Sequence, residues 1–258
     1  MSPILFEVKN TIAVITLNRP DKLNVINREM ALQLQQKLDE CDNNEDIRCV
    51  YITGAGKAFS AGQDLEEIAD SNGPNVLTVL SEHLNPIVRK IRRLHKPVVA
   101  AVNGVAAGAS ANIAICCDVV VAAQSASFIQ AFSKIGLIPD SGGTFFLPRL
   151  IGLQRALALM MLGDKVSAED AEHMGMIYKC FADEVFVAES FKIAKTLAQL
   201  PTRALYFTKK ALNQSFISSF EEQLHDEEIL QQRAAKTEDF KEGLHAFLEK
   251  RKPDFKGK

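Results

Sequence analysis

The hydrophobic pattern at the start of the chain predicts two strands followed by a helix. Residues 4–8 and 12–18 are apolar, or alternate between apolar and polar, on either side of a turn at Asn10, as strands do. Apolar residues at helical spacing then follow Asn27, a residue type that commonly caps a helix N-terminus. The opening order is therefore strand, strand, helix.

The combination of a strand, a small-residue turn and a helix recurs further along the chain. Residues 47–53 form an apolar run typical of a buried strand, and the loop over 54–62 leads to a helix that begins near Asp64, whose charge suits the positive end of a helix. The elements expected next are a helix over 77–94, a strand over 98–102, a turn over 104–108, a short helix over 110–117 and a strand over 118–123. Strands separated by helices pair mostly in parallel, so the predicted fold class is α/β.

The last quarter of the chain differs from this core. From Pro201 to Leu248 the apolar positions show only helical periodicity, and such helices need a surface against which to bury their apolar faces. We therefore expect an α/β core over residues 1–198 and a helical C-terminal segment over residues 199–258 that packs against a partner surface.

Composition and charge exclude several classes of function. The 258 residues are 47% hydrophobic, with a net charge of −2 and scattered Lys and Arg, which is not the footprint of a nucleic-acid-binding or acidic-membrane-binding protein. No apolar run reaches the roughly 18 residues of a membrane-spanning helix. The N-terminus shows no export or targeting pattern, so we expect a cytoplasmic protein with no membrane partner.

Cysteine and histidine spacing argues against a metal site. The five cysteines include the adjacent pair Cys116 and Cys117, and the five histidines are dispersed. Neither set has the spacing of a disulfide framework or a zinc site. We expect reduced thiols and no metal.

Three turns carry the candidate chemistry. Asp140 lies in the Gly/Pro-rich stretch 134–144 among apolar neighbours, and the small-residue turns over 59–64 and 103–112 offer exposed backbone N–H groups. The amides of Gln63 and Ala109 are the candidates for stabilising a developing oxyanion, because unpaired N–H groups at the start of a helix carry partial positive charge. An acid beside an oxyanion hole is typical of enolate chemistry. The alternative is that the glycines only permit tight turns and close packing.

Other catalytic motifs are incomplete. The segment 54–57 lacks the first glycine of a P-loop and the Ser or Thr after its lysine. Ser110 lies in a stretch that departs from the G-x-S-x-G elbow at its last glycine, and no histidine is placed to activate it. These motifs therefore do not indicate a nucleotide phosphate site or a serine hydrolase.

Across nearly its whole length the chain resembles the crotonase (enoyl-CoA hydratase/isomerase) superfamily. The motifs that carry the resemblance are Leu17-Asn-Arg-Pro20, Ala58-Phe-Ser-Ala-Gly-Gln-Asp64, Pro97-Val-Val-Ala-Ala-Val-Asn-Gly104, Gly136-Leu-Ile-Pro139 with Gly142-Gly-Thr144, and Ala246-Phe-Leu-Glu-Lys-Arg-Lys252. The resemblance implies a spiral of ββα units with a C-terminal trimerisation segment, and homotrimers that can stack into hexamers. It also implies an acyl-CoA thioester whose carbonyl oxygen lies between the amides of Gln63 and Ala109, with no cofactor other than the coenzyme A of the substrate.

The resemblance also bears on which reaction is catalysed. The two glutamates of the family's hydratases align with Asn112 and Phe132, which makes water addition by that pair doubtful, whereas Asp140 aligns with the acid of several isomerases. The stretches 102–109 and 132–144 are similar to a branch that isomerises ring epoxides of CoA thioesters. The predicted reaction is isomerisation with Asp140 as acid and base; a hydratase and a non-catalytic acyl-CoA binder remain alternatives.

The remaining predicted site residues concern substrate binding. The resemblance implies adenine recognition near Ala61 and CoA contacts at Lys22 and Leu23. It also implies CoA contacts from Phe247 and Lys250 of a neighbouring subunit. The alternative for the basic tail is a disordered end without a function. The other predicted contacts around the acyl group are Gly62, Asp64, Gly108, Asn112, Phe132 and Leu137. Burial would raise the pKa of Asp140 and the helix end would lower it, so its direction is left open.

Overall fold

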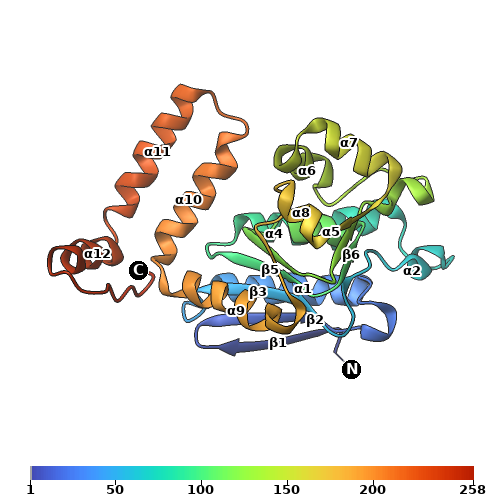
Figure 1. Cartoon of the computed structure of the whole chain (residues 1–258), viewed down its shortest axis with the longest axis horizontal. Coiled ribbons are helices and arrows are strands. Elements are labelled where there is room, and N and C mark those ends of the chain that lie inside the picture. Colours follow the sequence, from blue (N-terminus) through green and yellow to red (C-terminus); the bar gives the residue numbers. More distant parts are fainter. Residues whose placement is uncertain (1) are drawn as a thin grey trace.

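The structure contains two β-sheets, and the larger one includes the predicted N-terminal strands. In this computed structural model, which describes residues 2–258, six strands pair in the order β1, β2, β3, β5, β7 and β10. Their bounds are Ile4–Lys9, Ile12–Leu17, Cys49–Gly54, Val98–Val102, Val119–Ala123 and Lys179–Phe181. Only β1 and β2 pair antiparallel, and every later pair in this sheet is parallel. The α/β class is therefore confirmed (Figure 1).

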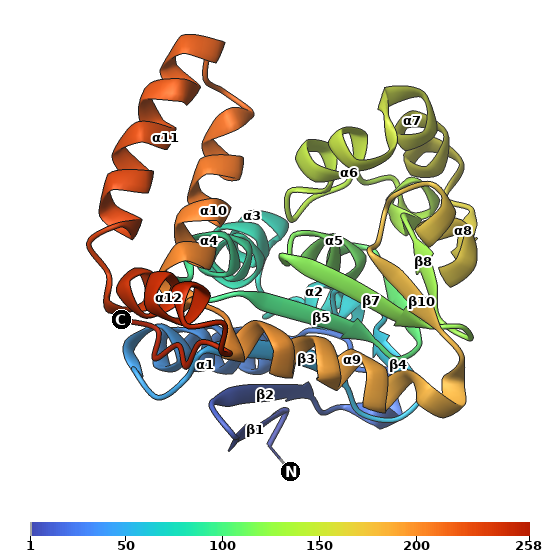
Figure 2. The same cartoon turned by 60° about the vertical axis from the view of Figure 1, so that its left-hand side comes forward.

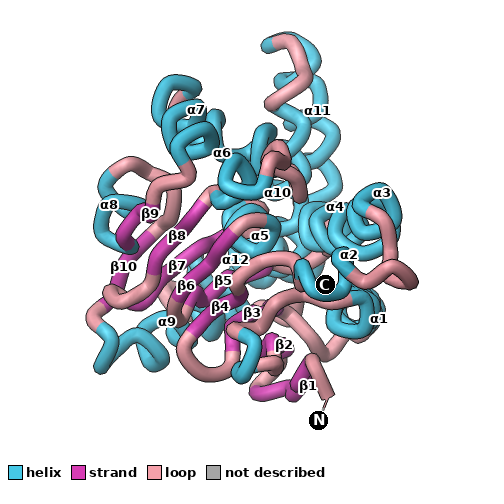
Figure 3. The backbone as a smooth tube through the Cα atoms, turned by 90° about the vertical axis from the view of Figure 1, so that its right-hand side faces the viewer, coloured by secondary structure: helices cyan, strands magenta, loops and turns pink. Residues whose placement is uncertain are grey.

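A second sheet contains strands that the sequence pattern did not predict. It pairs β4 (Ala58–Ser60), β6 (Val105–Ala107), β8 (Ser127–Ile129) and β9 (Lys165–Ser167) in that order. The prediction that 54–62 and 104–108 are only loop and turn was wrong, because β4 and β6 lie within them. Figure 3 shows β4, β6 and β8 beside the strands of the larger sheet, with β1 at the outer edge near the N-terminus.

Two glycines lie against neighbouring backbone where the chain passes from one sheet to the other. A Cβ atom on Gly54 would lie 2.2 Å from the carbonyl oxygen of Ala58, and one on Gly104 would lie 2.0 Å from that of Lys57. No larger residue can occupy either position without moving this backbone. The two glycines therefore permit each long strand to turn into a short strand of the second sheet.

The helices before residue 120 follow the predicted spacing closely. The long α1 (Arg28–Asn43) is capped by Asn27, whose side chain accepts from the Met30 amide at 3.0 Å. The others are α2 (Leu65–Ala69), α3 (Val76–Thr78), α4 (Asn85–Arg93) and α5 (Ala109–Ile115). The predicted helix over 77–94 is one run in which a π-helical turn, Val79–Leu84, joins α3 to α4.

Four more helices complete the part of the chain before residue 200. They are α6 (Gly143–Ile151), α7 (Leu153–Leu162), α8 (Ala168–His173) and α9 (Asp183–Gln199). Short 3₁₀ turns at Pro20–Lys22 and Ala131–Ile135 lie between the larger elements. No helix within residues 2–258 is both long and apolar enough to cross a bilayer.

The C-terminal segment is helical, as its periodicity predicted. It contains α10 (Thr202–Ser215), α11 (Phe220–Ala234) and α12 (Glu238–Leu248). In Figure 2, α10 and α11 lie side by side and extend beyond the sheets. Their large exposed apolar residues include Leu212, Phe216, Ile217, Phe220 and Leu224.

The basic tail after α12 folds back onto the molecule. The buried Asp239 carboxylate accepts from the amides of Lys256 and Gly257, at 2.6 and 2.8 Å. The Arg48 side chain donates to the carbonyl oxygen of Phe255 at 2.6 Å. The tail is therefore packed against the start of α12 and the core rather than being a disordered end.

Candidate active site

One apolar cavity of about 180 Å³ brings together most of the predicted site. Its walls come from the turns that follow β4 and β6, from α2, α3 and the π-helical turn within 65–84, and from the stretch over 131–140. The predicted site residues that line it are Ala61, Gly62, Gln63, Gly108, Ala109, Phe132, Leu137 and Asp140. The three predicted catalytic residues therefore face a common space.

The turn after β4 leaves the Gln63 amide unpaired. Gly62 accepts from the Ile26 amide at 2.7 Å, and Asp64 donates to the Ile26 carbonyl oxygen at 3.0 Å. Because alternate residues of an extended segment point in opposite directions, the intervening Gln63 N–H faces away from Ile26. Within residues 2–258 it donates no hydrogen bond.

The turn after β6 presents a second unpaired amide. Ala109 is the first residue of α5, so its N–H has no acceptor within the helix, and none elsewhere in the part of the chain described. A Cβ atom on Gly62 would lie 3.0 Å from the Ala107 carbonyl oxygen and 3.9 Å from the Ala109 nitrogen. The two turns are thus in direct contact, and both amides belong to the same cavity wall.

Asp140 lies on a tight turn immediately before α6. Its carbonyl oxygen accepts from the Gly143 amide at 2.8 Å, and its carboxylate accepts from the Ser141 hydroxyl at 2.9 Å. Ser141 and Gly142 both have positive φ, 50° and 79°, a backbone conformation that is costly for a serine. The sharp reversal leaves the half-buried carboxyl on the cavity.

The environment of Asp140 settles the direction of its pKa. Burial raises the pKa above its ordinary value, and the hydrogen bond from Ser141 only partly offsets this. Of the apolar residues that precede Asp140, Ile138 is 80% exposed, whereas Leu137 lines the cavity together with the carboxyl.

Six apolar residues from α2 and from the helix that follows it also line the cavity: Leu65, Ile68, Val76, Val79, Leu80 and Leu84. The sequence could indicate that the segment over 65–90 builds the pocket wall, but not which of its side chains face the cavity. Ala131, Lys134 and Ile135 also line the cavity, and no sequence pattern singled them out.

Asp64 and Asn112 were predicted to bind substrate but do not line the cavity. Asp64 is buried and forms an ion pair with Arg19 at 2.8 Å. Asn112 is fully buried, and its side-chain amide donates to the Asp140 carbonyl oxygen at 2.9 Å. Both were predicted to contact substrate; the structure instead places them where they support the turns that carry Gln63 and Asp140.

The residues predicted to contact coenzyme A fall into two groups. Lys22 and Leu23 are exposed, and the Leu23 carbonyl oxygen accepts from the Ala61 amide at 2.9 Å, which places this pair beside the cavity. Phe247 and Lys250 are exposed at the end of α12, which lies across the molecule from α2 (Figure 1). A contact from those two residues to a CoA site would therefore involve the site of another subunit.

Comparisons with known proteins show which family the chain resembles. A family model described as enoyl-CoA hydratase/isomerase matches residues 7–258. The chain is 44% identical to the 1,2-epoxyphenylacetyl-CoA isomerase of Escherichia coli K12, over 100% of both chains. It is 42% identical to a probable enoyl-CoA hydratase of Rhodobacter capsulatus, over 99% of this chain and 98% of that one. The crystal structure of an enoyl-CoA hydratase from Bacillus anthracis superposes with a TM-score of 0.92, at 32% identity, over 99% of this chain and 100% of that one.

Proposed function

Because the chain belongs to the enoyl-CoA hydratase/isomerase family, we propose that it is an isomerase that rearranges the acyl group of a CoA thioester through an enolate. The proposed substrate is 1,2-epoxyphenylacetyl-CoA, and the same site would shift a carbon–carbon double bond in an enoyl-CoA. The observation that carries the proposal is that Asp140 and the unpaired amides of Gln63 and Ala109 line one apolar cavity.

The two amides act on the thioester carbonyl. In the proposed complex its oxygen accepts from the N–H groups of Gln63 and Ala109, which stabilise the negative charge that develops when a proton leaves the α-carbon. The loss of one such donor typically costs about 10²- to 10³-fold in turnover. The apolar cavity strengthens this effect because little water competes for the charge.

Asp140 moves the proton. The ionised carboxylate removes a proton from one carbon and returns it to another while the enolate is held, so the acid form appears only during the reaction. The raised pKa of Asp140 favours removal of the proton, because a carboxylate with a higher pKa is a stronger base. No cofactor beyond the coenzyme A of the substrate takes part in this scheme.

Enoyl-CoA hydration is the second candidate, since a relative 42% identical bears that name. Addition of water needs a group to activate it. At the two positions aligned with the hydratase glutamates, Phe132 is apolar and the Asn112 amide is already hydrogen bonded. Asp140 would then have to activate the water alone.

A three-substrate assay separates these reactions. The purified protein is incubated with 1,2-epoxyphenylacetyl-CoA, with a 3-enoyl-CoA and with crotonyl-CoA, and products are identified by mass spectrometry. The isomerase proposal expects products of unchanged mass from the first two and no 3-hydroxyacyl-CoA from the third. Hydration of crotonyl-CoA without isomerisation would instead establish the hydratase.

We also propose that the protein assembles as a homotrimer, or as a hexamer of two trimers. Exposed apolar residues on α10, α11 and α12 support this assembly, because patches of this kind mark interfaces. In the trimer, Phe247 and Lys250 would approach the CoA bound to a neighbour. Light scattering on the purified protein would show a monomer if the proposal is wrong.

A further inference from the structure

A buried chain of side-chain amides lies beneath the turn that carries Asp140. Asn112 on α5 has no exposed surface, and its Nδ2 donates to the Asp140 carbonyl oxygen at 2.9 Å. Its Oδ1 accepts from Nε2 of Gln130 at 2.8 Å, and Gln130 is itself 3% exposed. Asn112 thus links α5 to Gln130 and to the turn that carries Asp140.

The contact is tight on both sides of the turn. The Gly143 amide donates to the same Asp140 carbonyl oxygen at 2.8 Å. A Cβ atom on Gly143 would lie 2.3 Å from Nδ2 of Asn112 and 2.6 Å from its Oδ1. The amide therefore packs directly against the first residue of α6, next to the positive-φ residue Ser141.

We propose that Asn112, oriented by Gln130, is a positioning residue that holds the Asp140 turn so that the carboxyl faces the Gln63 and Ala109 amides. The proposal rests on the proposed function of Asp140. An amide suits this place because it donates to one partner and accepts from another at once, whereas an ionised carboxylate only accepts. A strained turn keeps its geometry only when its surroundings impose it.

Two variants distinguish a positioning role of Asn112 from a purely structural one. In Asn112→Leu, a change of similar size, the Asp140 carbonyl loses a donor and the Gln130 amide is left buried without its acceptor, which destabilises the fold. In Asn112→Leu with Gln130→Leu that orphaned amide is gone, and replacing both partners by apolar groups is close to neutral for stability. The Asp140 turn lacks its support in both variants.

The test measures the melting temperature together with kcat and KM for a 3-enoyl-CoA. We expect kcat to fall about 10- to 100-fold in both variants, because small misplacements of a catalytic group have effects of this size, while KM stays within about twofold. The melting temperature should fall in the single variant and largely recover in the double. Recovery of kcat together with stability would overturn the positioning role.

A second readout does not depend on activity. Hydrogen exchange of the Gly143 amide reports on the turn itself, and we expect it to be at least about tenfold faster in Asn112→Leu. An unchanged exchange rate would overturn the inference even if the protein proves to have another activity. Failure of the wild-type protein to isomerise any substrate, with the Gly143 amide still dependent on Asn112, would instead refute only the proposed function.

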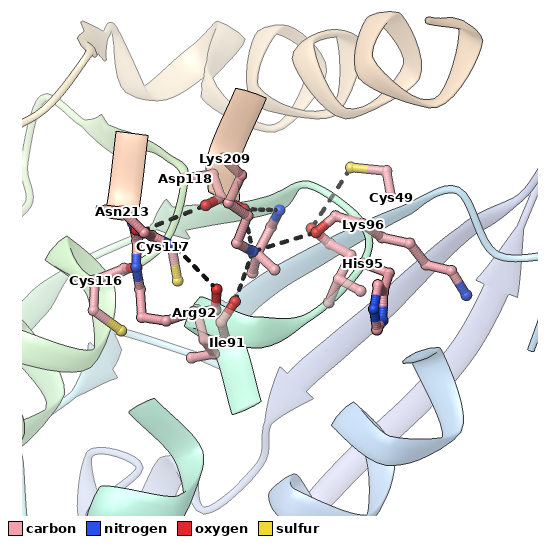
Figure 4. Close-up of polar contacts among 12 residues, drawn as sticks. Cys49, Ile91, Arg92, His95, Lys96, Cys116, Cys117, Asp118, Lys209 and Asn213 are labelled. Carbon is pink, nitrogen blue, oxygen red and sulfur yellow. Dashed lines mark hydrogen bonds and ion pairs between the residues drawn. The ribbon is translucent and has the colours of Figure 1, made fainter. Parts of the chain in front are cut away.

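A remote amide provides the matched control. Asn213 on α10 also donates to a backbone carbonyl, that of Arg92, at 3.2 Å (Figure 4). Asn213→Leu should lower stability but leave kcat per folded molecule and the Gly143 exchange rate unchanged. A comparable loss of kcat in this variant would show that any lost amide has the effect, and the specific role of Asn112 would fall.

Discussion

Lys209 on α10 provides a quantitative test of how the C-terminal segment is joined to the core. The side chain is 7% exposed, and its ammonium group donates to the Asp118 carboxylate at 2.8 Å and to the carbonyl oxygens of Ile91 and Lys96 at 2.6 and 3.4 Å. Figure 4 shows Lys209 from α10 meeting Asp118 and Ile91 at this junction. Lys209→Met removes the charge while keeping most of the side-chain volume.

The expected cost follows from the partners that remain. Breaking a buried ion pair costs about 3–5 kcal/mol when the other charge is left uncompensated. Asp118 keeps the Val98 amide at 2.8 Å and Arg92 at 3.4 Å, so we expect the lower end, about 3 kcal/mol. For a chain of this size that lowers the melting temperature by about 6–12 °C.

The assay is thermal unfolding at one fixed protein concentration, followed by circular dichroism. Exposed Lys210 on the same helix is the matched control, and Lys210→Met should change stability by no more than about 0.5 kcal/mol. Adding Asp118→Asn to Lys209→Met should recover part of the loss, because the carboxylate charge that lost its lysine partner is then removed. A melting temperature within about 2 °C of wild type in Lys209→Met, or no recovery in the double variant, would refute the reasoning.

Three further predictions concern the active-site turns and one helix. Because burial raises the pKa of Asp140, its ionised form destabilises the fold, and Asp140→Asn should melt above wild type at neutral pH. The difference in melting temperature should shrink as the pH falls through the raised pKa of Asp140. A difference that does not depend on pH would contradict this reasoning. Gly62→Ala strains a residue at φ +100° beside the Gln63 amide, so kcat should fall about 10²- to 10³-fold, and an unaffected kcat would contradict the role of that amide. Asn27→Ala removes the cap of α1 and should cost about 1 kcal/mol in urea unfolding, a value near zero showing that the cap contributes nothing.

The long elements could be predicted because their signal is local. The strands over 4–8, 12–18 and 47–53 show as apolar or alternating runs, and the helix after Asn27 shows as a period of about 3.6 residues. The strands β4 and β6 have three residues each, too few for a period. Their pairing depends on segments tens of residues away, so the sequence pattern predicted only a loop and a turn there.

The candidate site, like the fold, could be predicted only in part from the sequence. Asp140 and the two turns could be identified because small residues beside an acid form a local pattern, and they line one cavity. The partner of Asn112 lies 28 residues along the chain, so the sequence could not show that its side-chain amide donates to the Asp140 carbonyl oxygen. The direction of the Asp140 pKa likewise depended on burial by residues from several elements.

Comparing wild type with Asp140→Asn on a 3-enoyl-CoA is the most direct test of the central claim. Appearance of the conjugated 2-enoyl thioester is followed by its absorbance, and affinity for the CoA ester is measured in parallel by calorimetry. We predict conversion by the wild type, a loss of about 10²- to 10⁴-fold in the variant, and unchanged affinity. Conversion by Asp140→Asn at the wild-type rate would contradict the account, because the proton would then be moved by another group.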